Sequence, residues 1–461
     1  MTVTNLSGTN TSGRHLNSTL RRLAFFGLLL ALALSQFSLA IPVSAQEPAE
    51  TIRVRTRVVF LDALVKDKRT NAPVSDLKPE NFEVIDDGKA RPISYFTREG
   101  QARKPLSLIL ILDLREDGAG RFLKQPEILK MMADELAKLP PEDQVAILAV
   151  SIGEDEDRVW LTDFTNDRAQ LAAALARAPN YIGESASVRH NEAPTEAEIS
   201  TTQKKKQPDS GGNSSISISP SAKKVEAALE ERDKADDVVE TETIKGKNGA
   251  VVTRIRKKDG SVSLRRVSGS GKTTVELGDV YDMVEAVKEA TKKAETQRPN
   301  SQPALVWVSD GIVPVFLEDR DATEKYLTRS NVIFNSLTVD MRTLFKFLMP
   351  IAKPVGGWLG ISIYGAAKRM AQQTGGEAVR VNRARDYGNG LSTIIGNLTA
   401  RYSLGFTLAE DETDDGRLHN LEVKVKAQDE KGKTRKLNVN ARKGYYMTNT
   451  TEKEVTTSRA N

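Results

Sequence analysis

The first stretch of the chain with a clear apolar pattern lies at residues 51–100. Apolar and polar side chains alternate over much of it, and turn-forming residues stand at Asn71-Ala72-Pro73 and Asp86-Asp87-Gly88. Short alternating segments between such turns predict a small antiparallel β unit, of a size that suits a small sandwich. The apolar positions that carry this prediction are Ile52, Val54, Val58, Phe60, Ala63 and Val65.

The pattern changes at residues 104–180. The run at 105–112 is continuously apolar and ends at Asp113, which is typical of a strand buried on both faces of a parallel sheet. Strands that alternate with helices predict a doubly wound, Rossmann-like α/β domain. The elements expected after the first strand are a helix that stops at Pro140-Pro141, strands at 144–151 and 158–165, and a helix at 167–178.

Residues 181–277 break the α/β alternation. They are rich in Ser, Lys, Glu and Gly and have almost no aromatic residues, a composition that cannot bury a core. We therefore expect a flexible, low-complexity insertion. Alternating residues on both sides of Lys258-Asp259-Gly260-Ser261 predict one hairpin within it.

The α/β pattern returns at residues 278–408. A strand at 304–308 ends in Ser309-Asp310-Gly311, and a helix at 366–374 closes at Gly375-Gly376, which is a typical C-cap. The pattern predicts the second part of the same domain. After it we expect a C-terminal β extension at 409–447 and a disordered tail at 448–461.

The first 45 residues have the pattern of a secretory signal peptide. Arginines precede an apolar run at 23–41, and Val43 and Ala45 are the small residues that a signal peptidase requires for a cut after Ala45. We expect residues 1–45 to be removed and the mature protein to be secreted or periplasmic. The run is also about long enough to cross a bilayer, so the alternative is a protein anchored in the membrane by an uncleaved segment.

Composition excludes several kinds of chemistry. The 461 residues include no cysteine, which rules out disulfides, zinc–thiolate sites and thiol catalysis. The net charge of +5 is small for this length, and basic residues lie near acidic ones, so we expect no nucleic-acid partner. His15, His190 and His419 are scattered along the sequence, which argues against a histidine metal site or catalytic triad.

Residues 269–274 read GSGKTT and resemble the phosphate-binding loop of an ATPase. Gly271-Lys272-Thr273 fits the second half of that motif, but Arg266 stands where its first glycine belongs. The preceding residues are too charged for the buried strand that the motif requires. We interpret the segment as a Gly/Ser-rich joint where the insertion returns to the fold. A P-loop-like ATPase stays open as an enzymatic alternative.

Two strand ends carry the candidate chemistry. The apolar strand ends at Asp113, and the later one ends in Ser309-Asp310-Gly311. This arrangement resembles the von Willebrand factor type A domain, in which the first strand ends Asp-x-Ser-x-Ser. There, the serine hydroxyls, a threonine and a second aspartate hold one divalent cation at the top of the sheet, and a partner's carboxylate completes its shell. The resemblance implies the same α/β fold and a site for Mg²⁺ or Mn²⁺.

The resemblance extends to the von Willebrand factor A-related secreted proteins of acidobacteria. It covers nearly the whole mature chain outside 181–277. The matching motifs are Val74-x-x-Leu77-x-x-Glu80-Asn81-Phe82-Glu83-Val84, Asp86-Asp87-Gly88-Lys89, Pro105-Leu106-Ser107-Leu108, Val308-Ser309-Asp310-Gly311, Thr374-Gly375-Gly376, Arg401-Tyr402-Ser403-Leu404-Gly405-Phe406 and Ala441-Arg442-Lys443-Gly444-Tyr445-Tyr446.

The implied metal site departs from the family pattern, because Arg115 and Asp117 stand at the two serine positions and Gly278 at the threonine position. In one interpretation, Arg115 points into the site, forks onto Asp113 and Asp310 and replaces the cation's charge. In a second, Arg115 turns to solvent, and Asp113, Asp117 and Asp310 hold a cation. In a third, this end of the sheet is a solvated loop that binds nothing.

The sequence therefore predicts an exported, non-enzymatic binding module with a degenerate adhesion site. Ligands of open α/β sheets bind at the carboxyl ends of the strands, so we expect an unidentified protein partner there and no small-molecule substrate or cofactor. No nucleophile–base pair stands at a recognisable spacing. The other enzymatic alternative is a metal-dependent hydrolase at the aspartate cluster.

Overall fold

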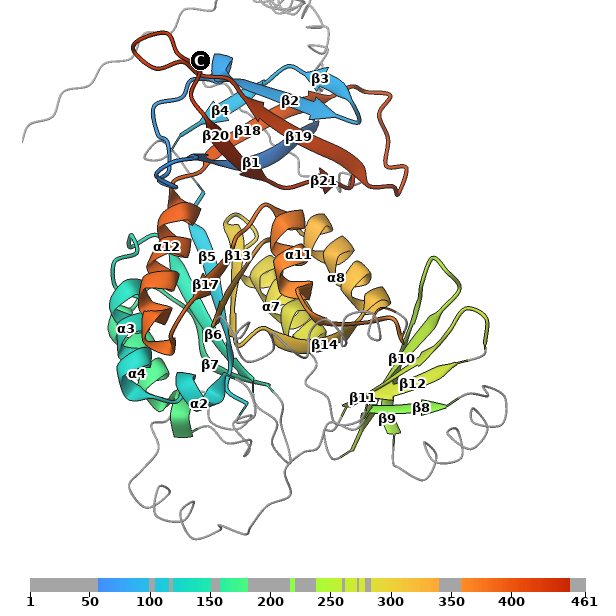
Figure 1. Ribbon diagram of the computed structural model, residues 1–461. Helices are drawn as coiled ribbons and strands as arrows, with labels where there is room; N and C mark the ends of the chain where they lie inside the picture. The colour runs from blue at the N-terminus through green and yellow to red at the C-terminus, as the bar shows by residue number, and fades with distance from the viewer. Residues whose placement is uncertain are drawn as a thin grey trace, which may run out of the picture. The chain divides into compact units, whose positions relative to one another are not determined.

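The apolar run of the sequence forms the centre of a six-stranded sheet (Figure 1). Strand β5 (Leu106–Asp113) is buried along its whole length. The sheet runs β17-β15-β13-β5-β6-β7; β7 is antiparallel to its neighbour, and the other strands are parallel. The remaining strands are β6 (Gln144–Val150), β7 (Arg158–Thr165), β13 (Gln302–Ser309), β15 (Ile333–Val339) and β17 (Ala378–Val381).

The computed structural model describes residues 57–98, 104–115, 119–150, 158–180, 216–219, 238–258, 262–271, 273–277, 283–339, 357 and 359–447. The predicted signal peptide at 1–45 and the predicted tail at 448–461 lie outside these residues. Numbered in chain order, the strands of the central sheet run 6-5-4-1-2-3, which is the doubly wound order read from one edge. The predicted α/β fold class is confirmed.

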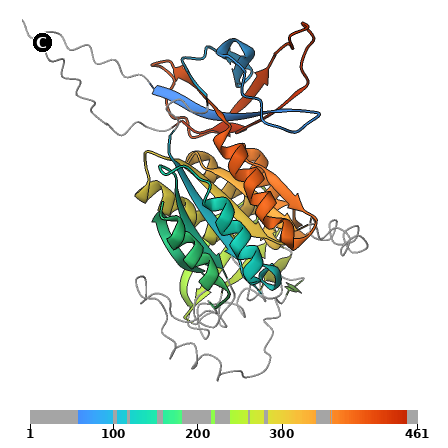
Figure 2. The same cartoon turned by 90° about the vertical axis from the view of Figure 1, so that its left-hand side faces the viewer.

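Helices cover both faces of this sheet. Neighbouring residues of a strand point to opposite sides, so a continuously apolar strand has apolar side chains to bury on both faces. Leu108 and Leu110 pack in the core on one face, while Ile109 and Ile111 pack in the core on the other. Figure 2 shows the first face, with α3 (Pro126–Leu136), α4 (Arg168–Arg177) and α12 (Tyr387–Thr399). The second face carries α7 (Met283–Gln297), α8 (Leu317–Arg329) and α11 (Ala366–Thr374). Short helices stand at α2 (Gly120–Leu123), η2 (Ala178–Asn180) and η4 (Ala384–Asp386).

Both ends of the described chain contribute to one β-sandwich with its own core. The predicted β unit at 51–100 and the predicted extension at 409–447 are therefore halves of the same body. The strand β18, assigned from sequence to the α/β domain, also belongs to the sandwich, which corrects the boundary at 408. The two sheets are β20-β1-β18-β4 and β21-β19-β2-β3.

The sandwich is held across a long separation in sequence. Strand β1 pairs with β18 on one side and with β20 on the other, and Tyr402 donates to the carbonyl oxygen of Val74 at 2.9 Å. The bounds are β1 (Arg57–Asp67), η1 (Pro79–Asn81), β2 (Phe82–Asp86), β3 (Lys89–Arg91), β4 (Tyr95–Thr97), β18 (Tyr402–Leu408), β19 (His419–Val425), β20 (Leu437–Ala441) and β21 (Gly444–Tyr445).

We use the word seam for the contacts that join the sandwich to the α/β domain. Glu377, just before β17, pairs with Lys66 of β1 and accepts from Asn440 of β20 at 3.2 Å. The backbone N–H of Lys443 donates to the carbonyl of Gln373 at 2.9 Å. Gly375 has a φ of +77°, and a Cβ there would lie 2.5 Å from the backbone nitrogen of Arg442, so the seam requires glycine at this position.

The insertion contains an ordered five-stranded sheet, β8-β12-β11-β10-β9. This corrects the expectation of a mostly flexible insertion with a single hairpin. The predicted hairpin is present, because β10 pairs antiparallel with β11. The strands are β8 (Ile216–Ser219), β9 (Val238–Lys245), β10 (Val251–Lys257), β11 (Val262–Val267) and β12 (Thr274–Leu277), and a two-stranded sheet of β14 (Ile312–Phe316) and β16 (Ile361–Tyr364) lies in the α/β domain.

A buried ion pair attaches the insertion sheet to helix α8. Arg266 of β11 donates from Nε and Nη2 to the two carboxylate oxygens of Glu318, both at 3.0 Å. Both side chains are buried, and Val252, Leu264 and Phe316 are among the residues of the small apolar core beside them. A charge in such a position is usually paired.

Within the described residues, no helix is long and apolar enough to cross a membrane.

Replacing Glu318 with alanine leaves the Arg266 guanidinium buried without its carboxylate. We expect the free energy of unfolding to fall by about 3 kcal/mol, the usual cost of breaking a buried ion pair. Urea denaturation measures this change. Glu430→Ala, at an exposed position, is the matched control. An equal effect from both substitutions would show that the ion pair does not hold the insertion sheet in place.

Candidate functional site

The carboxyl ends of β5 and β13 bring the predicted site residues together. Asp113 is the last residue of β5, and Ser309 is the last residue of β13. The two strands are parallel neighbours, so their ends meet at one edge of the sheet. The hydroxyl of Ser309 donates to Oδ2 of Asp113 at 2.7 Å. Ser309 was not among the predicted site residues, although it stands directly before Asp310.

Arg115 points into this site. It is 7 % exposed, and Asp113 is fully buried. The guanidinium donates from Nε to Oδ1 and from Nη2 to Oδ2 of Asp113, both at 2.8 Å. This is the bidentate fork that suits arginine and a carboxylate. The spacing Asp113-x-Arg115 allows this pair, because the side chain can fold back onto the strand end that precedes it.

Four donors occupy the carboxylate of Asp113. The backbone N–H of Arg115 adds a longer contact to Oδ1 at 3.3 Å, so each oxygen accepts from two groups. A carboxylate offers about four lone-pair positions in all. None is left to coordinate a cation, and the guanidinium would repel one. The residues present around Asp113 therefore do not fit a divalent cation, and we derive no step through a metal.

The other predicted metal ligands are placed differently. Asp310 is buried at the same strand end, where Ser309 lies 3.5 Å from its Oδ1. Asp117 lies outside the described residues, as does Gly278. The metal set Asp113, Asp117 and Asp310 thus stays a prediction as a set. Tyr387, the first residue of α12, donates to the carbonyl of Ser309 at 3.1 Å and fixes the strand end from the helix side.

The GSGKTT segment is the turn of a β-hairpin. It joins β11 to β12, which pair antiparallel, and the N–H of Ser268 donates to the carbonyl of Thr273 at 2.9 Å across the turn. A phosphate-binding loop instead runs from a strand into a helix whose N-terminus faces the phosphates. Gly271 takes the positive φ of a tight turn; Lys272 lies outside the described residues.

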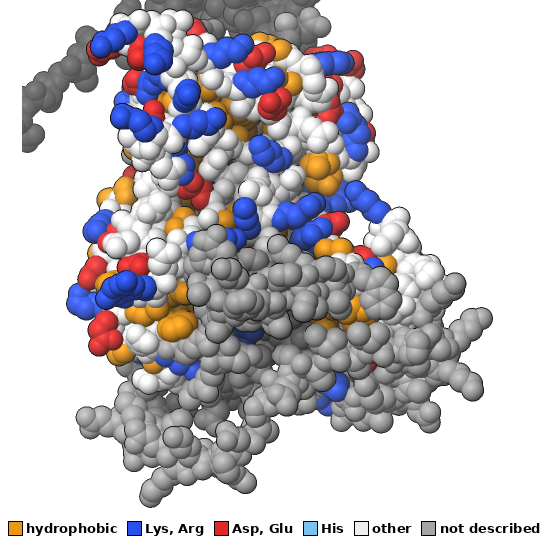
Figure 3. All heavy atoms as spheres, in the orientation of Figure 1, with side chains coloured by type: hydrophobic (Ala, Val, Ile, Leu, Met, Phe, Trp, Pro, Cys, Tyr) orange, Lys and Arg blue, Asp and Glu red, His pale blue; other side chains and the backbone are white. Residues whose placement is uncertain are grey.

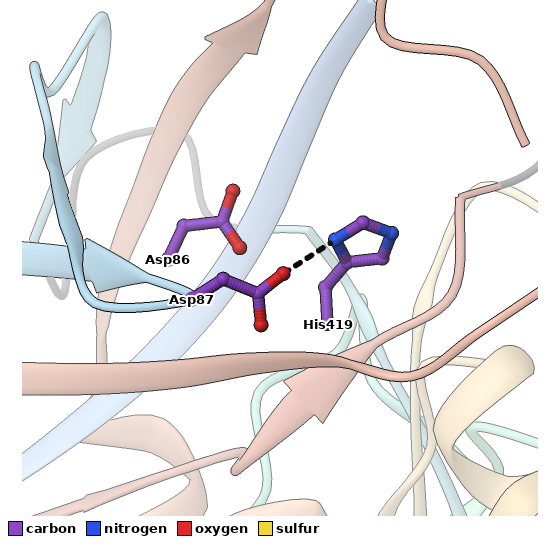
Figure 4. A group of neighbouring side chains, drawn as sticks. All are labelled: Asp86, Asp87 and His419. Carbon is purple, nitrogen blue, oxygen red and sulfur yellow. Dashed lines mark hydrogen bonds and ion pairs between the residues drawn. The ribbon is translucent and has the colours of Figure 1, made fainter. Parts of the chain in front are cut away.

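A second cluster of titratable residues lies in the sandwich (Figure 4). Asp86, Asp87 and His419 place one potential ligand atom each within 4.8 Å of one another. Asp86 ends β2, Asp87 follows it in the hairpin turn, and β19 supplies the histidine. Sequence analysis missed this cluster, because His419 is more than three hundred residues away from Asp87 along the chain.

Arginines already neutralise this cluster. Arg91 forks onto Oδ2 of Asp86 at 2.8 and 3.0 Å, and Arg417 donates to Oδ2 of Asp87 at 2.7 Å. The ring of His419 lies between Asp87 at 3.0 Å and Asp415 at 3.2 Å. Each aspartate of the cluster already has an arginine partner, so we interpret the network as a structural lock between β2 and β19 and not as a metal centre.

The same network shifts the pKa of its members. Burial and the neighbouring Asp86 carboxylate raise the pKa of Tyr445 well above its usual value of 10, because both disfavour the phenolate. Its hydroxyl donates to Oδ2 of Asp86 at 3.1 Å. The hydrogen bond from Arg91 lowers the pKa of Glu412, although partial burial opposes it.

The raised pKa of Tyr445 predicts a loss of stability in alkali. The unfolded chain releases this proton near pH 10, whereas the folded protein retains it to higher pH. The stabilisation is complete below pH 10 and falls above it by about 1.4 kcal/mol per pH unit until the folded pKa is reached. We expect Tyr445→Phe to make this decline shallower in urea denaturation between about pH 9 and 11.5.

Tyr95→Phe, at an exposed position, is the control for this experiment and should leave the decline unchanged. Identical pH profiles for wild type and Tyr445→Phe would contradict the assignment.

No protein-family model matches the sequence, and no curated protein matches it. Solved structures do match. The SpRpn10 VWA domain has 8 % identity and a TM-score of 0.28; the match covers 63 % of this chain and 94 % of that one. A von Willebrand factor type A protein from Catenulispora acidiphila has 7 % identity and a TM-score of 0.32, over 78 % and 72 %. The pilus adhesin SpaC from Lactobacillus rhamnosus GG, in its open conformation, has 7 % identity and a TM-score of 0.32, over 82 % and 48 %.

These values limit the comparison to the fold. Identities below 10 % and TM-scores near 0.3 carry no argument about ligands or partners, and this chain spans only about half of the length of the pilus adhesin. The doubly wound fold itself rests on the strand order of the central sheet. In its fold, the α/β domain of this chain is similar to von Willebrand factor type A domains.

Proposed function

We propose that this chain is an exported, non-enzymatic binding module that recognises a protein partner at the carboxyl edge of its central sheet. The observation that carries the proposal is the fork of Arg115 onto Asp113. It stands at the position where the resemblance implies a cation, in a fold whose ligands bind at this edge. The export part of the proposal rests on the signal-like pattern of residues 1–45.

In this proposal, the arginine takes over the cation's electrostatic role. A buried carboxylate needs a compensating positive charge, and the guanidinium supplies one that is always present, because arginine does not titrate near neutral pH. Recognition of the partner is then independent of Mg²⁺ and Mn²⁺. In this proposal the site lacks the ligand pattern of a metal site, and the guanidinium of Arg115 balances the charge of its buried carboxylate.

In our proposal, the described residues at this edge give the partner a rigid base. Ser309 donates to Asp113, and Tyr387 fixes Ser309 from α12. Binding residues are often positioned by a rigid scaffold of this kind. Residues 116–118, 151–157 and 340–356, which follow β5, β6 and β15 along the chain, lie outside the described residues.

Replacing Arg115 with serine tests the electrostatic part of the proposal. The substitution removes the guanidinium and restores the Asp-x-Ser spacing of the family's first metal-binding loop. We expect the melting temperature of wild type after chelator treatment to be unchanged by Mg²⁺ or Mn²⁺, and that of Arg115→Ser to rise with either ion, since a ligand bound only by the folded state stabilises it.

Arg435→Ser is the matched control, because it removes an arginine from another carboxylate pair, at Asp76, and should not respond to metal. A clear rise of the wild-type melting temperature with Mg²⁺ or Mn²⁺ would contradict the proposal and favour the cation-binding interpretation.

Partner binding is tested with the purified chain immobilised in chelator and exposed to cell-envelope proteins of the source organism. We expect one retained protein whose binding, measured afterwards with both components purified, survives the chelator and weakens at least about tenfold when Arg115→Glu places two like charges at the edge. Binding that requires a divalent cation would contradict the proposal. ATP-dependent thermal stabilisation that Lys272→Ala abolishes would revive the ATPase alternative instead.

A further inference from the structure

A cavity of about 750 Å³ lies at the seam between the sandwich and the α/β domain. Its volume is in the range of ordinary ligand sites, about 300–1,000 Å³. Residues from β1, β17, β20 and the last turns of α11 line it, and exposed side chains such as Asn71, Gln372 and Thr393 stand at its border. This cavity is separate from the edge that carries Arg115, and a ligand bound in it is independent of the function proposed for that edge.

The lining is strongly biased toward positive charge. Lys66, Lys368, Arg369 and Lys443 line the cavity, against the single carboxylate of Glu377. Figure 3 shows lysine and arginine side chains gathered on the face of the molecule that carries α11 in Figure 1. The cavity therefore attracts anionic groups.

The fold uses only part of this charge. Glu377 is neutralised by Lys66 and also accepts from Asn397 and Asn440, and Arg369 pairs with Glu324 at 2.8 Å. Lys368 and Lys443 are exposed, and no ion pair joins either of them to another described residue. These two ammonium groups are available to a ligand.

A buried arginine in contact with the cavity lining adds to the positive potential. Arg401 is 8 % exposed and donates from Nη2 to the carbonyl of Gly375 at 2.8 Å. Its Nε and Nη1 have no hydrogen-bond partner among the described residues. The carbonyls at the end of α11 would oppose an anion, but Arg401 and the N–H of Lys443 already occupy two of them, those of Gly375 and Gln373.

Residues of two outer strands also line the cavity. Strand β17 is the outer strand of the central sheet, and β20 is the outer strand of one sandwich sheet. Ala378 and Val379 of β17 and Val439, Asn440 and Ala441 of β20 line the cavity. An outer strand presents unpaired backbone N–H and C=O groups, which an added strand can satisfy. This favours an extended polypeptide over a saccharide or a free anion.

We propose that the seam cavity binds an extended acidic peptide segment of a partner protein, which adds to the edge of β17 or β20 while its carboxylates contact Lys368 and Lys443. Backbone hydrogen bonds supply the affinity in this mode, and the two lysines select for acidic side chains. The amide side chains of Gln372 and Gln373 are placed to donate to or accept from the peptide's polar groups.

The test uses a fluorescent peptide of about ten residues with alternating Glu and Val, a sequence suited to an added strand. Fluorescence anisotropy with the purified chain at about 0.15 M salt measures the dissociation constant. We expect saturable binding that weakens with added salt. The Lys368→Glu/Lys443→Glu double variant should bind at least about tenfold more weakly, because it reverses both free charges. Lys431→Glu, at an exposed position outside the cavity, is the matched control and should bind as wild type.

Two further probes decide between ligand classes. A peptide of the same sequence, N-methylated at alternate residues, has the same charge but fewer backbone donors, and it should bind at least about tenfold more weakly. Polygalacturonate carries the carboxylates on a saccharide and should not compete with the peptide.

Any of these results would overturn the inference: no peptide binding up to about 1 mM, equal binding by the charge-reversed variant with an unchanged melting temperature, equal binding of the N-methylated peptide, or full competition by polygalacturonate. Arg115→Ser should bind the peptide as wild type does. Loss of the peptide in Arg115→Ser would place binding at the sheet edge and also overturn the inference, whereas the metal response of that variant reports on the proposed function alone.

Discussion

A carboxylate at the end of a fully buried strand must be neutralised, and the candidate site is built around that constraint. Strand β5 is inaccessible along its length, so Asp113 has no access to water that would stabilise its charge. Arg115 and Ser309 provide the compensation from the same strand end and from the neighbouring one. Removing either would leave a charge or a polar group in the interior, which costs more than an exposed contact is worth.

The same rule recurs in three other ion pairs of this chain. Arg266 and Glu318 attach the insertion sheet to α8. Lys66 and Glu377 join the sandwich to the α/β domain. Arg91 and Asp86 close the network around His419. Each pair connects two separate elements, and removing one partner would leave the other charge without compensation.

The sequence predicted the apolar strand β5 but could not predict how the charges at its end are paired. The β5 strand was predictable, since eight consecutive buried residues are apolar apart from Ser107 and Asp113. The inward fork of Arg115 was one of the open interpretations, because Asp113 and Arg115 are two residues apart. The local spacing alone could not choose between them, because the choice depends on how deeply Asp113 is buried.

The insertion sheet was not predictable from composition. Its strand β11 carries two arginines at buried positions, and a charged strand looks solvated when its partner is unknown. Glu318 lies about fifty residues further along the chain and on a helix. The His419 cluster and the union of the two β units depend on pairings across more than three hundred residues. Patterns of local periodicity contain no information about such pairings.

The seam and the sheet edge place two different kinds of charge before a partner. At the sheet edge, the charge of Arg115 is compensated by the buried carboxylate of Asp113. At the seam, the fold satisfies Glu377 from several sides and leaves Lys368 and Lys443 exposed. Charged side chains that are paired within the fold stabilise the protein, and exposed charged side chains are available for recognition. The leftover charge lies beside two sheet edges with unpaired backbone groups, so the seam combines both elements of strand-type peptide recognition.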